Sequence, residues 1–280
     1  MIRTLSEQTP AAGILPPELY RQYGGDLVFP PAFADRPYVI GNFVSSLDGV
    51  VSFLVPGHAG GGDISGHDAH DRFIMGLLRA SVDAVMIGSG TLHATAPGHL
   101  WTAESIYPEA AEIYDRYRKD ILKKPGPPLT VIASAGGLVD LQRATFHTPG
   151  ISVQIITTAE GRVRLDAGGV KRLRSTQVTV LADSGPAVAP AAILQFLRAE
   201  AGTRLLLHEG GPTLFGEFVA AGLVDEFFLT LAPQIAGRGF DRPRPAMVAG
   251  AEFLPQTAPW LQLLSVKQGG NHLYLRYRRT

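Results

Sequence analysis

The strongest constraint on the fold of this chain is a regular alternation of short apolar runs with helical patterns from Tyr38 onwards. The runs are rich in β-branched residues and too short for helices, while the segments between them carry apolar residues at helical spacing. Near-continuous apolar strands separated by helices are typical of a parallel sheet covered on both faces. The expected strands are residues 38–43, 83–88, 129–133, 152–157, 178–182, 204–209 and 226–232.

Two further apolar runs close the sequence, residues 260–268 and 272–278, with Gly269, Gly270 and Asn271 between them. A connection this short permits only antiparallel pairing, because a parallel pair needs a long crossover. The sequence therefore predicts an α/β fold with a mostly parallel sheet flanked by helices and with antiparallel C-terminal strands. Residues 1–36 are rich in proline and turn formers and are expected to be an irregular N-terminal extension, followed by a single domain over residues 37–280.

Composition excludes several classes of function. Lys and Arg together number 25, as do Asp and Glu, so no overall basic field favours nucleic acid or an anionic membrane as a partner. The chain has no cysteine, which excludes disulfides, thiolate catalysis and cysteine-bound metals. The first residues lack the apolar segment of a secretory signal, and no apolar run could span a bilayer. A cytoplasmic protein with a small-molecule partner is expected.

The stretch "HEGGPTLFGEF" from His208 to Phe218 joins an expected strand to an expected helix through Gly210, Gly211 and Pro212. Glycines allow the backbone to approach a ligand, and the partial positive charge of a helix N-terminus favours an anion. This turn, together with the helix that is expected to begin at Thr213, could therefore bind a pyrophosphate. The alternative is that these glycines simply make the turn.

A second turn follows another expected strand in "VMIGSGTLH", where Gly88, Ser89, Gly90 and Thr91 could wrap a phosphate. It lacks the last glycine of a G-x-G-x-x-G fingerprint, because His93 stands there. Asp48 in "SSLDGV" ends the first strand, where ligands of open α/β sheets bind. The alternative reading of Asp48 is a common Asp-Gly turn.

A histidine-rich stretch, "GHAGGGDISGHDAHD", places His67 near His70 and Asp71 at a spacing seen in metal sites. Ser65 and Asp68 match a capping box, which would explain part of the pattern by helix capping. No metal is expected.

Three stretches, "YVIGNFVSSLDGVV", "ISGHDAHDRFIMGLLRASVDAVMIGSGT" and "LLLHEGGPTLFGEFVAAGLVDEFFLTLAPQIAGR", resemble the reductase domain of bacterial riboflavin biosynthesis, the C-terminal half of the bifunctional deaminase-reductase. The resemblance runs from about Arg36 to Arg278 and implies a fold like that of dihydrofolate reductase. It implies an oxidoreductase similar to 5-amino-6-(5-phosphoribosylamino)uracil reductase, with a pyridine nucleotide, usually NADPH, as cofactor. It also implies a homodimer.

The same resemblance assigns roles to residues. Cofactor binding is implied for Gly88, Ser89, Gly90, Thr91, Gly210, Gly211, Thr213 and Leu214. Substrate binding is implied for Ser46, Asp48, Ser65 and Glu209, with Asp48 and Glu209 as the catalytic pair. If these two carboxylates approach closely in a partly buried site, the pKa of at least one should rise and favour proton donation near neutral pH.

Two departures from the family pattern bear on the substrate. Riboflavin-pathway members often carry Lys after S-L-D-G, where this chain has Val50. The segment 92–101 keeps Pro97 and Leu100 but lacks the Asp and the Arg that usually occur there. Alternatives are therefore a reductase of the same fold acting on a pterin or a secondary metabolite, or a nucleotide- or flavin-binding protein without turnover. The sequence does not decide between NADP and NAD.

Overall fold

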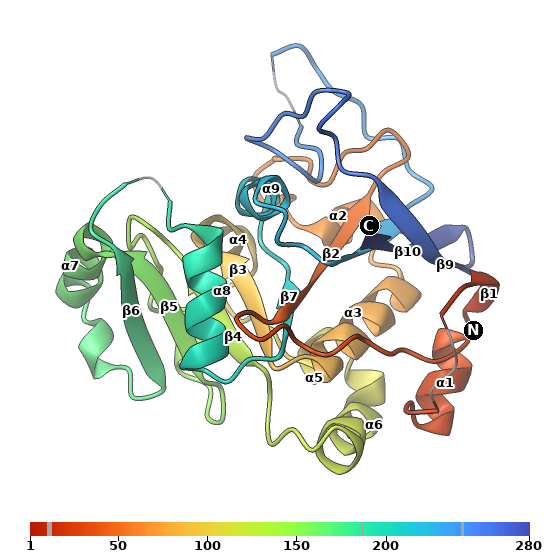
Figure 1. Cartoon of the computed structure of the whole chain (residues 1–280), viewed down its shortest axis with the longest axis horizontal. Helices are drawn as coiled ribbons and strands as arrows, with labels where there is room; N and C mark the ends of the chain where they lie inside the picture. The colour runs from red at the N-terminus through yellow and green to blue at the C-terminus, as the bar shows by residue number, and fades with distance from the viewer. Residues whose placement is uncertain (10–12, 186, 242–243) are drawn as a thin grey trace.

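The computed structural model describes residues 1–9, 13–185, 187–241 and 244–280, and within them ten strands form one continuous sheet (Figure 1). The strand order is β1-β9-β10-β8-β2-β7-β3-β4-β5-β6. The strands are β1 (Arg3–Glu7), β2 (Tyr38–Ser45), β3 (Ala84–Gly88), β4 (Leu129–Ala133), β5 (Val153–Thr158), β6 (Thr176–Ala182), β7 (Leu205–His208), β8 (Glu226–Leu231), β9 (Leu261–Gly269) and β10 (His272–Arg279).

The strands from β8 to β6 pair in parallel, and β10, β9 and β1 complete the sheet in antiparallel fashion. The predicted α/β fold with a mostly parallel sheet and antiparallel C-terminal strands is thus confirmed. β9 and β10 turn at Gly269 and Gly270, and His272 pairs with Gly269. Gly270 has a positive φ of 56°, a conformation that glycine adopts at little cost.

The prediction that residues 1–36 form an irregular extension was wrong in part. Residues Arg3–Glu7 form β1, which pairs with β9 and supplies the outer edge of the sheet, and Pro17–Tyr23 form helix α1. Leu19 and Tyr23 of α1 are buried in the core. The N-terminal segment therefore packs as part of the same sheet and core as the rest of the chain.

Helices cover both faces of the sheet, and alternate residues of each central strand point to opposite faces. In β3, Val85 and Ile87 join the core on the side of α3, while Ala84 and Met86 join the core under α8 and α9. The helices are α2 (Gly61–Ser65), α3 (Ala69–Ser81), α4 (Ser89–Ala94), α5 (Ala103–Ile106), α6 (Ala111–Arg116), α7 (Ala159–Ala167), α8 (Pro190–Ala199) and α9 (Pro212–Ala220).

The segment after Pro108 is not one regular helix but a short 3-10 turn (Pro108–Ala110), then α6, then a π-helical turn (Tyr117–Ile121). The capping box expected at Ser65 was wrong. Asp68 is the N-cap of α3, and its carboxylate accepts a hydrogen bond from the Asp71 amide at 2.9 Å.

A buried cluster of charges holds the C-terminal strands to β2. Glu226 at the start of β8 is fully buried and forms ion pairs with Arg276 at 2.7 Å and Arg278 at 2.8 Å. The hydroxyl of Tyr38 donates a further hydrogen bond to Glu226 at 2.9 Å. The carboxylate oxygens thus have partners that replace the water lost on burial.

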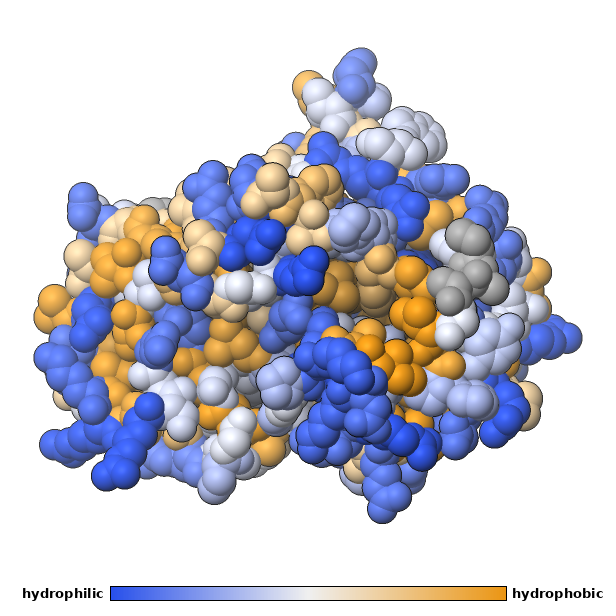
Figure 2. All heavy atoms as spheres, turned by 60° about the horizontal axis from the view of Figure 1, so that its bottom comes forward, coloured by the Kyte–Doolittle hydropathy of each residue, from blue (hydrophilic) through white to orange (hydrophobic). Residues whose placement is uncertain are grey.

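The outer surface combines hydrophilic residues with patches of hydrophobic ones on the face shown in Figure 2. Large apolar side chains that remain exposed in the described chain include Phe240 and Trp260. Among the described helices, none is both long and apolar enough to cross a membrane.

Removal of the buried carboxylate tests this account of the fold. We expect Glu226→Ala to lower the free energy of unfolding by roughly 3–5 kcal/mol, because it leaves Arg276 buried without a counter-charge. Urea denaturation followed by circular dichroism measures the loss. Glu18→Ala, which removes an exposed partner of Arg116, is the control and should have little effect. Equal stability of the two variants would contradict a structural role for Glu226.

Candidate functional site

Two glycine-rich turns meet at one edge of the sheet, because β3 and β7 are parallel neighbours. β3 ends at Gly88, which is also the N-cap of α4. β7 ends at His208, and Gly211 is the N-cap of α9. A Cβ atom at Gly211 would lie 3.4 Å from Oγ1 of Thr91, so little space separates the two turns.

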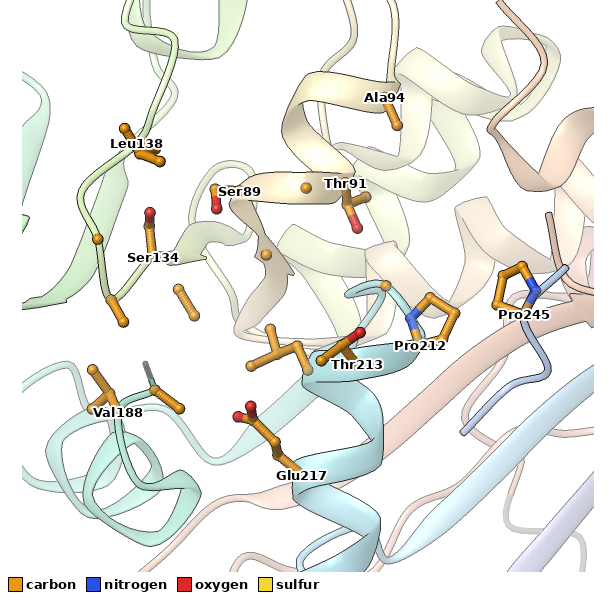
Figure 3. Close-up of a pocket in the computed structure, with 18 of the residues that line it drawn as sticks. Ser89, Thr91, Ala94, Ser134, Leu138, Val188, Pro212, Thr213, Glu217 and Pro245 are labelled. Atoms are coloured by element: carbon orange, nitrogen blue, oxygen red, sulfur yellow. The ribbon is translucent and has the colours of Figure 1, made fainter. Parts of the chain in front are cut away.

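A cavity of about 510 Å³ opens beside these turns (Figure 3). Its volume is in the range of small-molecule and cofactor sites. The two turns form the middle of its lining. One end is formed by the loop after β4, residues 133–136 with Leu138, and by Val188 and Ile193 near the start of α8. Ser52, Leu54, Ala59 and Pro245 line the other end.

Most of the residues expected to bind the cofactor line this cavity. They are Gly88, Ser89, Gly90, Thr91, Gly211, Thr213 and Leu214. Gly210 is not among the lining residues. Its amide donates to Nδ1 of His208 at 3.1 Å, and a Cβ atom there would lie 2.7 Å from the His208 ring. The structure thus brings both turns to one cavity but directs Gly210 toward the core.

His208 supports the turn from below. The side chain is fully buried between the rings of Phe215 and Phe218, whose centroids lie 5.0 and 4.9 Å away. Burial lowers the pKa of His208 to about 3, so the imidazole is neutral at physiological pH. Because Nδ1 accepts the Gly210 amide, the ring proton resides on Nε2, which has no hydrogen-bond partner among the described residues.

Asp48 follows β2 and binds the backbone of a distant loop. Its carboxylate accepts hydrogen bonds from the Ser46 hydroxyl at 2.6 Å and from the amides of Ala236 at 3.0 Å and Gly237 at 2.7 Å. The Ser46 hydroxyl, then the Ala236 amide, lowers the pKa of Asp48 below its ordinary range. The rise in pKa was expected for at least one of the two carboxylates if they approached closely, and Asp48 is not that one, because its lowered pKa makes it a poor proton donor at neutral pH.

The loop held by Asp48 reaches the cavity through Pro245. Arg238 donates to the carbonyl oxygens of Asp48 at 2.8 Å and Gly49 at 2.9 Å, and the Val51 amide donates to Pro245 at 3.0 Å. Asp48 itself is not among the residues that line the cavity. Its contacts join the end of β2 to the loop that supplies one end of the cavity.

Ser46 and Ser65, both expected near the substrate, are buried. The Ser46 hydroxyl donates to Asp48 and accepts the Val50 amide at 3.0 Å, so it shapes the turn after β2. Ser65 is the last residue of α2 and donates to the carbonyl of Gly62 at 3.3 Å. Neither serine is among the residues that line the cavity.

Glu209 lies directly after β7 and forms a buried ion pair with Arg79 of α3. Its Oε2 atom is 2.8 Å from Nη2 of Arg79, and the two side chains are 8% and 2% exposed. Arg79 also donates to the carbonyl oxygens of Leu100 at 3.2 Å and Thr102 at 3.3 Å. Glu209 does not line the cavity, so the two expected catalytic carboxylates are not brought together in it.

Two residues of the site were missed by the sequence analysis. Arg79 lies in the apolar run "FIMGLLRA" of α3, where a charged residue at a buried helix position indicates an ion-pair partner elsewhere. Glu217 lines the cavity from α9, one helical turn after Thr213. The spacing of Thr213 and Glu217, i and i+4, could have placed both on one face.

The histidine-rich stretch does not gather metal ligands. No group of three or more His, Asp or Glu side chains in the described ranges of the chain could hold a metal ion. His70 Nδ1 lies 3.7 Å from Oδ1 of Asp68, and His272 Nδ1 lies 3.8 Å from Oδ2 of the same carboxylate. Burial raises the pKa of Asp71. The sequence-based expectation of no metal remains a prediction.

Solved structures with the same fold come from several organisms. RibD of Acinetobacter baumannii is 23% identical with a TM-score of 0.61, and 88% of this chain spans 59% of that protein. A pyrimidine reductase-like protein of Corynebacterium diphtheriae is 19% identical with a TM-score of 0.64, covering 88% of this chain and 93% of the other. The riboflavin biosynthesis reductase of Saccharomyces cerevisiae is 17% identical with a TM-score of 0.58, covering 94% and 99%.

A sequence relative extends the comparison. The 2,5-diamino-6-ribosylamino-4(3H)-pyrimidinone 5′-phosphate reductase of Archaeoglobus fulgidus is 29% identical over 221 residues, which are 78% of this chain and 89% of that protein. Residues 37–275 match the family described as the RibD C-terminal domain. The match spans the sheet from β2 into β10, together with both glycine-rich turns. The chain therefore belongs to the family of RibD C-terminal domains.

Proposed function

We propose that this chain is a reductase that transfers hydride from a nicotinamide cofactor, bound in the cavity, to a small ribosylated pyrimidine. The observation that carries the proposal is the meeting of two glycine-rich turns in one cavity of a RibD C-terminal domain. The cofactor would supply the hydride, and the protein would position the nicotinamide against an electrophilic carbon of the substrate.

The lining fits a dinucleotide. The first turn of α9 presents the backbone N–H groups of Gly211 and Thr213 and a partial positive charge, the arrangement that favours a pyrophosphate, while Pro212 between them has no N–H to offer. Ser89 and Thr91 add hydroxyl groups from the neighbouring turn. The sequence resemblance implies NADPH as the form of the cofactor. The proposed hydride transfer is the same whether the cofactor is NADPH or NADH.

The substrate class follows from the relatives. The Archaeoglobus protein is named for a ribosylamino-pyrimidinone phosphate, and a related pyrimidine would fit a reductase of this family. Val50 supports the alternative of another heterocycle, such as a pterin. Its side chain is fully buried in a small cluster with Val44 and Ile64, so this position offers the substrate no positive charge where family members often have Lys.

The two expected catalytic carboxylates are proposed as positioning groups. Asp48 would fix the loop that carries Pro245, and Glu209 would fix the segment from Leu100 to Thr102 through Arg79. Direct proton donation by Asp48 does not fit its lowered pKa. Hydride transfer itself needs no protein nucleophile, so positioning can account for a large part of the rate.

Gly211→Val tests the cofactor site. Gly211 has φ of −64° and ψ of 167°, which a valine can adopt, so the variant should fold. The new side chain would occupy space between Thr91 and the cavity, and we expect the dissociation constant for the nicotinamide cofactor to rise by more than tenfold. Isothermal titration of wild type and variant with NADPH and with NADH gives the comparison. Unchanged affinity of a folded variant would remove the proposed site.

Glu209→Gln tests the positioning role of Glu209. The variant leaves the buried guanidinium of Arg79 without its counter-charge, and we expect the free energy of unfolding to fall by about 3 kcal/mol. Chemical denaturation measures the change. Glu160→Gln is the control, since Glu160 is an exposed partner of Arg164. A Glu209→Gln protein as stable as wild type, with turnover reduced, would instead assign Glu209 to the reaction.

The homodimer implied by the resemblance also remains a proposal. β9 offers no free edge for a partner subunit, because β1 pairs with one of its sides and β10 with the other. Large apolar side chains remain exposed between residues 235 and 260, among them Ile235 at 77% and Trp260 at 82%. We expect light scattering to give a dimer mass that Trp260→Ser reduces toward the monomer. A monomer mass for wild type across a wide concentration range would rule the dimer out.

A further inference from the structure

The cavity has two chemically different ends. At the end formed by Ser52, Leu54 and Pro245, the lining belongs to the loops that Asp48 joins. At the other end, Ser134, Leu138 and Val188 form a mostly apolar wall (Figure 3). If a pyrophosphate binds in the middle at the two turns, the two nucleosides of a dinucleotide must occupy the two ends. The resemblance implies substrate contacts at Ser46 and Asp48, which hold the loops of the Pro245 end, so we assign the nicotinamide to that end and the adenosine to the Val188 end.

Glu217 projects into the cavity from α9. In Figure 3 its carboxylate points into the cavity on the side of Thr213 that faces Val188. Among the described residues that line the cavity, Glu217 is the one with an ionisable side chain. It is half-buried, and burial raises the pKa of its carboxyl group. A carboxylate in this position gains from hydrogen-bond donors on a ligand and is repelled by a second anion.

The two forms of the cofactor differ at this point of the molecule. NADH carries a free 2′-hydroxyl on the adenosine ribose, and NADPH carries a phosphate there. Acidic residues accept hydrogen bonds from the free hydroxyl in dinucleotide-binding folds, and arginine accommodates the phosphate. The charge of the residue that faces the ribose therefore decides between the two cofactors.

Arg164, the arginine that contacts this wall at Gly136, already has two hydrogen-bonding partners. Arg164 of α7 donates to the carbonyl oxygen of Gly136 at 2.8 Å and forms an ion pair with Glu160. Its guanidinium is thus bound by a backbone carbonyl of the wall and by an acidic side chain, and the acidic partner reduces its net attraction for a phosphate. Glu217 has no such counter-charge in the cavity lining.

We propose that Glu217 accepts hydrogen bonds from the adenosine ribose and makes this site select NADH over NADPH. The inference rests on the proposed function, because it assumes that a nicotinamide dinucleotide is the ligand. It departs from the NADPH that the sequence resemblance implies. The determinant is one side chain of α9 whose carboxylate points into the cavity and which is the one ionisable group among the described lining residues.

Titration of the intact protein with NADH and with NADPH tests the proposal. We expect wild type to bind NADH at least tenfold more tightly than NADPH. Glu217→Gln should reduce this ratio at least tenfold, mainly through tighter NADPH binding, and Glu217→Arg should invert it. Glu200→Gln is the matched control, since it removes the same charge from the exposed C-terminal end of α8, outside the cavity.

The outcomes separate the two proposals. Wild type that binds NADPH as tightly as NADH, or a ratio that Glu217→Gln leaves unchanged, overturns the role of Glu217 while the reductase proposal stands. Failure of wild type to bind either nucleotide overturns both. If the glutamine variant does not fold, the wild-type ratio and the arginine variant still decide. An equal change in the Glu200→Gln control would trace the effect to overall charge and overturn the role of Glu217.

Discussion

The insertion of β7 between β2 and β3 is the constraint on which the site depends. β2 and β3 follow each other along the chain but do not pair, because β7 lies between them and pairs in parallel with both. The carboxylate of Asp83 fixes the start of β7 by accepting the amides of Arg204 at 2.9 Å and Leu205 at 2.8 Å. Because the carboxyl ends of parallel neighbours meet at one edge, the turns after β3 and β7 must face the same space.

Buried charges maintain this geometry where apolar packing alone would leave loops free to shift. The Arg79–Glu209 pair joins α3 to the end of β7, and the remaining donors of Arg79 hold the segment from Leu100 to Thr102. A buried ion pair contributes little net stability compared with apolar packing, but it tolerates few alternative arrangements once its partners are in place. The ion pair therefore contributes more to the position of the glycine-rich turn than to the stability of the fold.

Local patterns in the sequence were sufficient for most of the fold. Strand periodicity, helix periodicity and the Gly269–Asn271 turn predicted the parallel sheet and its antiparallel C-terminal strands, because each is specified by neighbouring residues. β1 was missed, since "RTLSE" is short and polar and becomes a strand only by pairing with β9. The cap at Asp68 was misassigned to Ser65 because two capping residues stand within one turn of each other.

In the candidate site, too, the features specified by neighbouring residues were predicted and those that depend on distant pairs were not. The glycine-rich turns were predicted because glycine content and a strand-to-helix change are visible locally. The surroundings of Glu209 were not, because its partner Arg79 lies 130 positions away. Asp48 likewise binds amides of residues 236 and 237, and this contact lowers its pKa instead of raising it. Charge environments depend on pairs that the fold alone brings together, so the partners and protonation of Asp48 and Glu209 could not be read from the sequence around them.

The charge that α9 presents to the cavity changes from positive to negative within a single turn of the helix. At the start of the helix the N–H groups of Gly211 and Thr213 carry partial positive charge, and this field falls off within the first turn. Glu217 follows one turn later on the same side, where the helix no longer offsets a negative charge. An anion is therefore favoured at the start of the helix, and a group with hydroxyl donors is favoured beside Glu217. This order matches a pyrophosphate followed by a ribose, so one short helix can recognise two successive parts of a dinucleotide.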